Sequence, residues 1–257
     1  MMLTPAQEHW QRTMAARRGD EQMLAAALTA YEQILHRLRI DQARLSDLQG
    51  KERKAEYKRT VMAAYDGWID GVLAADTGQA DEVLTHIMIW QIDIGNYGRA
   101  LTLAAYVIRH GLPLPDRYQR TIGPLLVDEI CDQALTIFAT GDDTLDPIPL
   151  DILEQLTELV TPLDMPNQVR AKLFKTLAYT LRTQPQRDAK ERALSLMQQA
   201  LLLFANIGVK KEIETLSREL KKAEDNTVTP SPPPKPATTG KKPTKTKTTA
   251  AKSQSSR

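Results

Sequence analysis

The clearest hydrophobic pattern in the chain lies in residues 80–127, where two helical repeats follow each other with almost no gap. In the first repeat, apolar residues occupy most positions around a helix, so we expect this helix to be buried on nearly all sides. Gly95 and Asn96 end it, because both residues tolerate the left-handed backbone that closes helices. A second helix starts at Tyr97 and ends before Gly111, with prolines beyond it. Two helices joined by so short a turn predict an αα-hairpin.

The second helix of this hairpin has the residue pattern of a tetratricopeptide-type repeat. Ala100 and Ala104 lie on one face and are small enough to let a neighbouring helix approach closely. Together with Gly95, Tyr97 and Leu101, they match the second half of such a repeat. This likeness concerns packing alone, and it predicts an all-α fold built from helical hairpins with tetratricopeptide-like packing.

The rest of the chain shows the same helical spacing, interrupted by turn signals. A second αα-hairpin is predicted from helices at 166–183 and 188–206, joined around Pro185. Residues 140–150 contain a glycine, two prolines and several acids, which predicts a loop. Further helices are predicted at 4–18, 61–75, 124–139, 151–160 and 209–224, with a short one starting at Pro115.

Residues 21–60 contain no proline and no glycine before Gly50, which predicts a long amphipathic helix or a helical hairpin. Their apolar groups recur at about a heptad step. Such a stripe either joins copies of the chain or packs within one chain. The candidate oligomerisation residues are Leu28, Tyr31, Leu35, Leu38 and Leu45.

The chain divides into five parts on these patterns. We predict an N-terminal basic helix with the long helix or hairpin at 1–60, a central hairpin core at 61–140, a loop at 141–150, a C-terminal hairpin with a final helix at 151–225, and a disordered tail at 226–257. The tail consists mainly of Pro, Thr, Lys and Ser, which cannot bury enough apolar surface to offset the entropy of ordering.

Charge is unevenly distributed along the chain. The net charge is +2, but the tail contains seven Lys and Arg residues and no acid, which leaves −5 for residues 1–225. Overall basicity therefore does not identify the folded part as a nucleic-acid binder. Two local basic segments do suggest phosphate contacts, although a solvated helix face is the alternative interpretation of the second. Their candidate DNA-binding residues are Arg12, Arg17 and Arg18, and then Lys51, Arg53, Lys54, Lys58 and Arg59.

No motif for catalysis stands out. There is no phosphate-binding GxxxxGK[ST] loop, no strand-turn-helix unit for a dinucleotide, and the four histidines are scattered. The single cysteine, Cys131, lies in an apolar helical pattern, which predicts a buried structural thiol. Asp66 and Asp70 are one helical turn apart, but no third metal ligand is near them in sequence. We therefore expect no metal site and no cofactor.

Aspartates in the 140–150 loop are interpreted as turn formers, because the central glycine and closing glutamate of a calcium loop are missing. No apolar run approaches the roughly 20 residues needed to span a membrane, and the N-terminal segment has no signal-peptide core. We expect a cytosolic protein with no membrane contact. On its residues alone, the chain is an all-helical binding or assembly protein.

Several segments, in the same order, resemble the terminase small subunit of temperate contractile-tailed bacteriophages with cohesive ends. The resembling segments cover most of residues 5–222 and are HWQRTMAARR (9–18), KERKAEYKR with YDGWIDGVL (51–73), DEVLTHIMIWQIDIGNYGRAL (81–101), RHGLPLPDRYQRTIGPLLVDEI (109–130), DMPNQVRAKL (164–173) and GVKKEIETLSREL (208–220).

The resemblance implies a subunit that binds the packaging (cos) site of concatemeric double-stranded phage DNA in the cytoplasm of the bacterial host. It also implies a terminase large subunit as partner, which carries the ATPase, and a homo-oligomer, often a ring. The family is often labelled the terminase endonuclease subunit. If this chain itself made the staggered cos cut, Mg²⁺ would be the expected cofactor, and the first carboxylates to mutate would be Asp66, Asp70, Asp128 and Glu129. A helical-repeat scaffold that binds a peptide is a third alternative.

Overall fold

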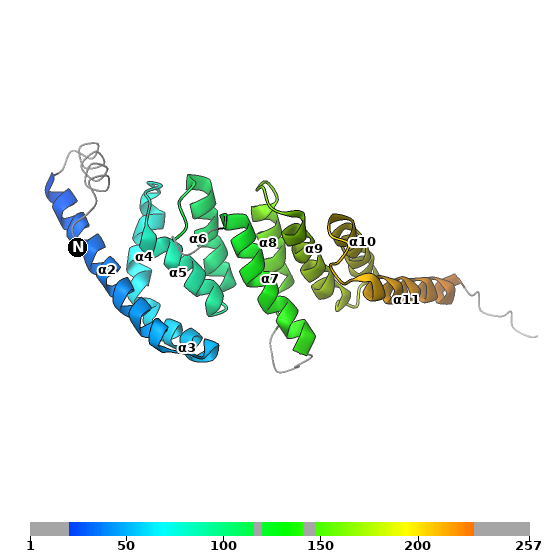
Figure 1. The fold of residues 1–257 in the computed structure, drawn as a ribbon. Coiled ribbons are helices and arrows are strands. Elements are labelled where there is room, and N and C mark those ends of the chain that lie inside the picture. The colour runs from blue at the N-terminus through cyan, green and yellow to red at the C-terminus, as the bar shows by residue number, and fades with distance from the viewer. Residues whose placement is uncertain (1–20, 116–119, 141–146, 229–257) are drawn as a thin grey trace, which may run out of the picture.

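The computed structural model describes the backbone of residues 21–115, 120–140 and 147–228, and within them the side chains that lie between residues 30 and 223. Figure 1 shows this part of the chain as an elongated array of helices, with α2 at one end and α11 at the other. No strand occurs in these ranges, so the predicted all-α fold is confirmed. The helix predicted at 4–18, the short helix starting at Pro115 and most of the tail fall outside the described residues.

The helices follow one another with short connections. They are α2 (Glu21–Asp47), α3 (Lys51–Val61), α4 (Ala63–Ala75), α5 (Glu82–Asp93), α6 (Tyr97–His110), α7 (Ile122–Thr140), α8 (Leu150–Val160), α9 (Asn167–Arg182), α10 (Arg187–Leu203) and α11 (Lys210–Val228).

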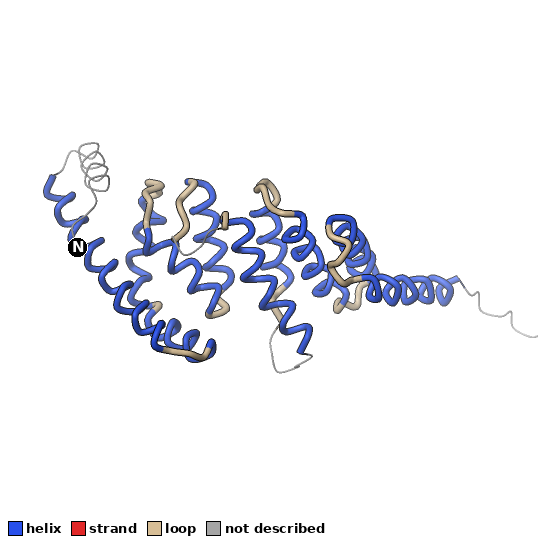
Figure 2. The backbone as a smooth tube through the Cα atoms, in the orientation of Figure 1, coloured by secondary structure: helices blue, strands red, loops and turns tan. Residues whose placement is uncertain are grey.

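Hairpins make up the centre of the array. Helices α5 and α6 pack against each other, and so do α9 and α10, which confirms the two predicted αα-hairpins. Between them, α7 packs on α9 and α8 packs on α6, so the pair α7–α8 bridges the two hairpins. In Figure 2 the turns within the hairpins α5–α6 and α9–α10 lie at one edge of the array, and the connection between α8 and α9 lies at the opposite edge.

Helix α5 is the most deeply buried element, as its sequence predicted. Its ten positions from Val83 to Ile92 are all buried. The helix ends at Gly95, whose φ of +82° is the left-handed conformation that glycine adopts without steric cost. In its core the Tyr65 ring of α4 packs edge-on against Trp90, with centroids 6.1 Å apart.

The first and last described helices end at other positions than the sequence predicted. The 21–60 segment is not one helix: α2 ends at Asp47, a turn follows, and α3 starts after Gly50, which has an extended backbone. At the other end, α11 continues to Val228, past the predicted end at 224 and into the first residues of the predicted tail. No proline follows until Pro230, so nothing in the local sequence forbids the extra turn.

The buried side chains form two clusters. The larger cluster runs from Leu38 on α2 to Leu177 on α9 and includes the centres of α5, α6 and α7. A smaller cluster joins α9, α10 and α11 around Met197 and Leu216. The domain boundaries suggested by the sequence stay a prediction. Among the described helices, none is long and apolar enough to cross a membrane.

Candidate nucleic-acid interface

Helix α3 carries the second basic segment, and its inner face is fixed by contacts to other helices. The Tyr57 hydroxyl donates a hydrogen bond of 2.6 Å to Oδ1 of Asp41 on α2. The other oxygen of Asp41 accepts a bond of 2.6 Å from the Tyr65 hydroxyl of α4. Asp41 is buried, so this carboxylate joins three helices with both oxygens satisfied. Val61 at the end of α3 is buried as well.

Lys58 differs from the other basic residues of α3. Only 11% of its side chain is exposed, and its ammonium forms an ion pair with Asp93 at the end of α5. The same ammonium lies 5.8 Å from the centre of the Trp90 ring. Lys58, which the sequence suggested as a DNA contact, therefore points toward the core of the protein.

The remaining cations of α3 are free of acidic partners. Lys51, Arg53 and Arg59 are exposed, and Lys54 is half-buried. Over the described residues, no carboxylate lies within ion-pair distance of these four side chains, and Arg59 donates only a 3.4 Å bond to the Ile94 carbonyl. Unpaired cations on a rigid helix are suited to contact phosphates.

Acids interrupt this surface. Glu52 and Glu56 are also exposed on α3, and neither forms an ion pair within the described part of the chain. Together the four unpaired cations and the two acids carry a net charge of +2. Because these side chains point in different directions around α3, the rotation of the helix about its own axis decides which of them face a partner.

Arg44 is a basic residue that the sequence analysis did not select. It is exposed near the end of α2, and its positive charge acts on the Tyr57 phenol. The turn after α2 therefore brings Arg44 beside α3, although it is separated from the 51–59 run in sequence. A turn predicted before Gly50 would have indicated that Arg44 lies beside α3. Arg12, Arg17 and Arg18 lie outside the described residues.

The candidate oligomerisation stripe on α2 contributes to the core of its own chain. Leu38 is fully buried and Leu45 nearly so, while Tyr31 and Leu35 are half-buried against the same cluster. The Tyr31 ring lies 5.6 Å from the Trp68 ring of α4, centroid to centroid. Part of the stripe is therefore used within the chain. The side chain of Leu28 is outside the described set.

The four carboxylates named for a nuclease occur on two helices, α4 and α7. Asp66 and Asp70 are exposed on α4, and Asp70 pairs with Arg99. Asp128 on α7 pairs with Arg120 and, at 2.8 Å, with Lys172 of α9. In the described ranges, no group of three or more His, Cys, Asp or Glu residues has an arrangement that could hold a metal ion.

Glu129 lies beside the Lys58–Asp93 pair. Burial raises the pKa of the Glu129 carboxyl, and the negative charges of Asp93 and Asp132 raise it further, whereas Lys58 lowers it. The positive charge of Lys58 thus acts on the carboxyl groups of both Asp93 and Glu129.

Cys131 is fully buried, and burial raises its thiol pKa to about 12. The predicted burial of this thiol is confirmed, and a thiol with so high a pKa stays protonated at neutral pH.

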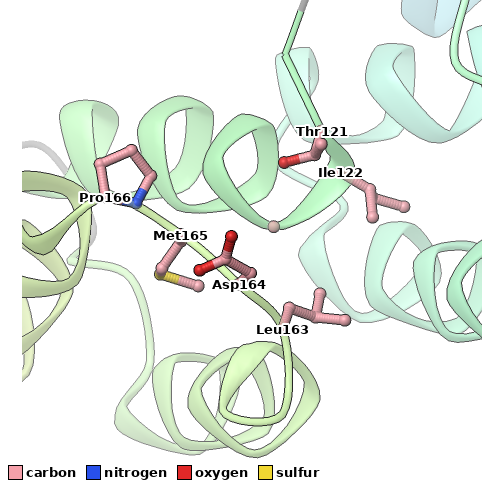
Figure 3. A pocket seen from close by; sticks show the side chains of 7 residues that line it. Thr121, Ile122, Leu163, Asp164, Met165 and Pro166 are labelled. Carbon is pink, nitrogen blue, oxygen red and sulfur yellow. The ribbon is translucent and has the colours of Figure 1, made fainter.

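A groove of about 540 Å³ lies where α7 begins, beside the connection between α8 and α9. Figure 3 shows the side chains that line it, with the Asp164 carboxylate between the largely apolar groups of Leu163 and Met165. Gly123 lies in its wall, where a Cβ atom would be 3.3 Å from Leu163. The lining offers one carboxylate and mostly apolar surface, which does not define a catalytic chemistry.

Comparison with known proteins places these features in a family. The sequence profile of the phage small terminase subunit matches residues 35–168. The chain belongs to the phage small terminase subunit family. It is also 36% identical over 249 residues to the terminase, endonuclease subunit of Escherichia phage P2, covering 96% of this chain and 94% of that protein.

The residues that match the small terminase family include helix α3, with its candidate DNA contacts, and the central hairpin. The profile runs from the middle of α2 to the start of α9, and thus contains α3, the Lys58–Asp93 pair and all four named carboxylates. The longer alignment with the phage P2 protein extends over nearly the whole chain. No solved structure matches this chain.

Proposed function

We propose that this small terminase subunit recognises double-stranded phage DNA at the packaging (cos) site and delivers it to the terminase large subunit. Family membership supports a role in genome packaging. The observation that carries the DNA-binding proposal is the set of unpaired cations on α3, held on a helix whose inner face is fixed to α2 and α5. The large subunit would supply the ATPase, and the complex would work in the cytoplasm of the bacterial host.

Phosphate contacts would come from several parts of the chain. Arg53, Lys54 and their neighbours on α3 provide a fixed surface, with Arg44 beside it. Arg12, Arg17 and Arg18 add a second basic segment, and the tail lysines add affinity that does not depend on DNA sequence. Each neutralised phosphate releases counterions, so every true contact contributes about one unit to the slope of log affinity against log salt.

Self-association is a further part of the proposal. The candidate surface is the apolar stripe of α2, and within it the residues that are not buried in the core of the same chain. Leu28 and the half-buried Leu35 are the first to test, since Leu38 and Leu45 are buried within the chain. A ring of copies would present α3 repeatedly to the DNA.

The alternative is that this chain cuts DNA itself, as the name of the phage P2 relative states for that protein. Asp66, Asp70, Asp128 and Glu129 would then be the first carboxylates to test, with Mg²⁺ as the cofactor. Their arrangement does not favour this alternative, because Asp70 and Asp128 are already paired with arginines or lysine. A helical-repeat scaffold for a peptide is a third possibility, and it predicts no preference for DNA once the tail is removed.

The test of DNA recognition compares two quadruple variants of the full chain. The first replaces Lys51, Arg53, Lys54 and Arg59 of α3 by alanine. The matched control replaces Lys210, Lys211, Lys221 and Lys222, which are exposed on α11 at the far end of the array. Affinities for a cos duplex and a scrambled duplex are measured by fluorescence anisotropy.

We expect the α3 variant to lose affinity and the preference for the cos duplex. The α11 variant should lose only non-specific affinity, which affects both duplexes alike. Equal losses of preference in the two variants would show that α3 is not the recognition surface.

A further inference from the structure

Within the part of the chain that the structure describes, Lys58 is the one cation of the 51–59 segment that is held by an acid of another helix. It pairs with Asp93 at the end of α5, next to the Trp90 ring, and most of its surface is covered. The preceding residue, Tyr57, is hydrogen-bonded to Asp41 of α2. Two consecutive residues of α3 are thus bound to two different helices.

Consecutive residues of an α-helix point about 100° apart around its axis. Binding Tyr57 in one direction and Lys58 in another therefore fixes the rotation of α3, which a single contact cannot do. Rotation matters here because Glu52 and Glu56 point to one side of the exposed part of α3, together with Arg59, whereas Arg53 points about 60–100° away from the two acids. A rotation by one residue would place Glu52 where Arg53 now points.

We propose that Lys58 is a positioning residue of the DNA interface, which sets the rotation of α3 through Asp93 and does not itself contact phosphate. This inference rests on the proposed DNA-binding function. Asp93 of α5 pairs with the Lys58 ammonium, and the charge of Lys58 also acts on Glu129 of α7, so acids of two other helices face this lysine. With 11% of its side chain exposed and its ammonium paired with Asp93, Lys58 offers little surface to a phosphate.

The two roles predict opposite results for Asp93→Asn. A positioning role predicts that this variant binds the cos duplex roughly tenfold more weakly, because α3 loses one of the contacts that fix its rotation although a repelling charge has been removed. If Lys58 were a phosphate contact, Asp93→Asn would free its ammonium and would strengthen binding.

The salt dependence gives a second readout that a merely structural effect does not mimic. Lys58→Met keeps the apolar stem and removes the charge. We expect it to weaken binding to a similar extent while leaving the slope of log affinity against log salt unchanged. Arg53→Ala should instead lower that slope by about one unit, as the loss of a direct phosphate contact does.

The exchange Lys58→Asp with Asp93→Lys restores an ion pair of reversed polarity and completes the test. We expect it to recover affinity relative to Asp93→Asn, with circular dichroism and thermal unfolding confirming that each variant is folded. A lower salt slope for Lys58→Met, or tighter binding by folded Asp93→Asn, would overturn the positioning role. Failure of the proposed function is recognised separately: the wild-type chain would then show no preference for the cos duplex, and Arg53→Ala would not alter the slope.

Discussion

The indole N–H of Trp68 on α4 donates a 2.8 Å hydrogen bond to Asp81, the residue that caps the N-terminus of α5. The other oxygen of Asp81 accepts a 3.0 Å bond from the backbone N–H of Leu84. This buried carboxylate therefore satisfies one of the unpaired amides at the start of α5 and links the most buried helix to its neighbour.

Replacing Asp81 by alanine should lower the free energy of unfolding by about 2 kcal/mol, from the lost cap and the unpaired indole N–H. Chemical denaturation of the full chain measures the change. Asp151, an exposed acid in the first turn of α8 with no described side-chain partner, is the matched control and should change stability by less than about 0.5 kcal/mol on replacement by alanine. Equal effects of the two substitutions would show that the Asp81 bonds contribute little.

Asp76 predicts a dependence of stability on acid pH. A hydrogen bond with His110 lowers the pKa of the Asp76 carboxyl below its usual 3.8, and the charge of Arg109 lowers it further. A carboxyl with a lowered pKa in the folded state stabilises the protein above its unfolded pKa of about 3.9, and this contribution is lost as pH falls through the folded value.

Asp76→Asn tests this dependence, because asparagine tolerates the left-handed φ of +47° found at this position. The unfolding temperature of the variant should be lower than that of the wild type at pH 6, and the two should converge as the pH falls below about 4. A difference that is constant between pH 6 and pH 3 would contradict the assignment.

Position 78 requires glycine, both for its backbone conformation and for the space around it. Its φ is +67°, and a Cβ atom would lie 2.4 Å from Nδ1 of His110, whose ring is held by Asp76 and lies 4.5 Å from the Tyr106 ring. We expect Gly78→Ala to destabilise the protein by about 1–3 kcal/mol.

Gly71→Ala is the opposite case and serves as its control. Gly71 lies inside α4, where a Cβ atom would meet nothing within 4 Å. The substitution should stabilise the helix by roughly 0.5–1 kcal/mol in thermal unfolding. If both glycine substitutions destabilised the protein, α4 would have to be covered at Gly71 by a contact outside the described chain.

The two halves of the α2 stripe should respond differently to mutation. Leu38→Ala removes a fully buried side chain and should cost about 2–5 kcal/mol without changing the mass of the assembly at concentrations where the chain stays folded. Leu28→Asp should reduce the mass measured by analytical ultracentrifugation. An unchanged mass for Leu28→Asp would reject α2 as the association surface.

Local sequence signals predicted the central hairpin well, because they act over a few residues. Gly95 ends α5 because glycine readily adopts a left-handed backbone, and apolar residues all around α5 indicate that the helix is covered on all sides. The end of α11 was placed too early, since the composition of the tail changes before the helix stops.

The side-chain partners at the candidate site could not be predicted in this way. Lys58 is separated from Asp93 by 35 residues, so the sequence carried no sign of this ion pair. As members of one basic segment, Lys58 and Arg53 were both predicted to contact DNA, although Lys58 is largely covered and Arg53 is exposed. Asp128 likewise meets Lys172 across 44 residues. Spacing along one helix identifies a shared face, but it does not reveal which helix packs on that face.

Recording DNA binding and strand cleavage together distinguishes a recognition subunit from a nuclease. The full chain, without the large subunit, is incubated with Mg²⁺ and either a cos duplex or a scrambled duplex, and binding and strand cleavage are recorded together. We expect preferential binding to the cos duplex with no cleavage, and loss of that preference in the α3 quadruple variant. Cleavage that survives stringent purification, stops with EDTA and is lost in an Asp66, Asp70, Asp128 or Glu129 alanine variant would contradict it.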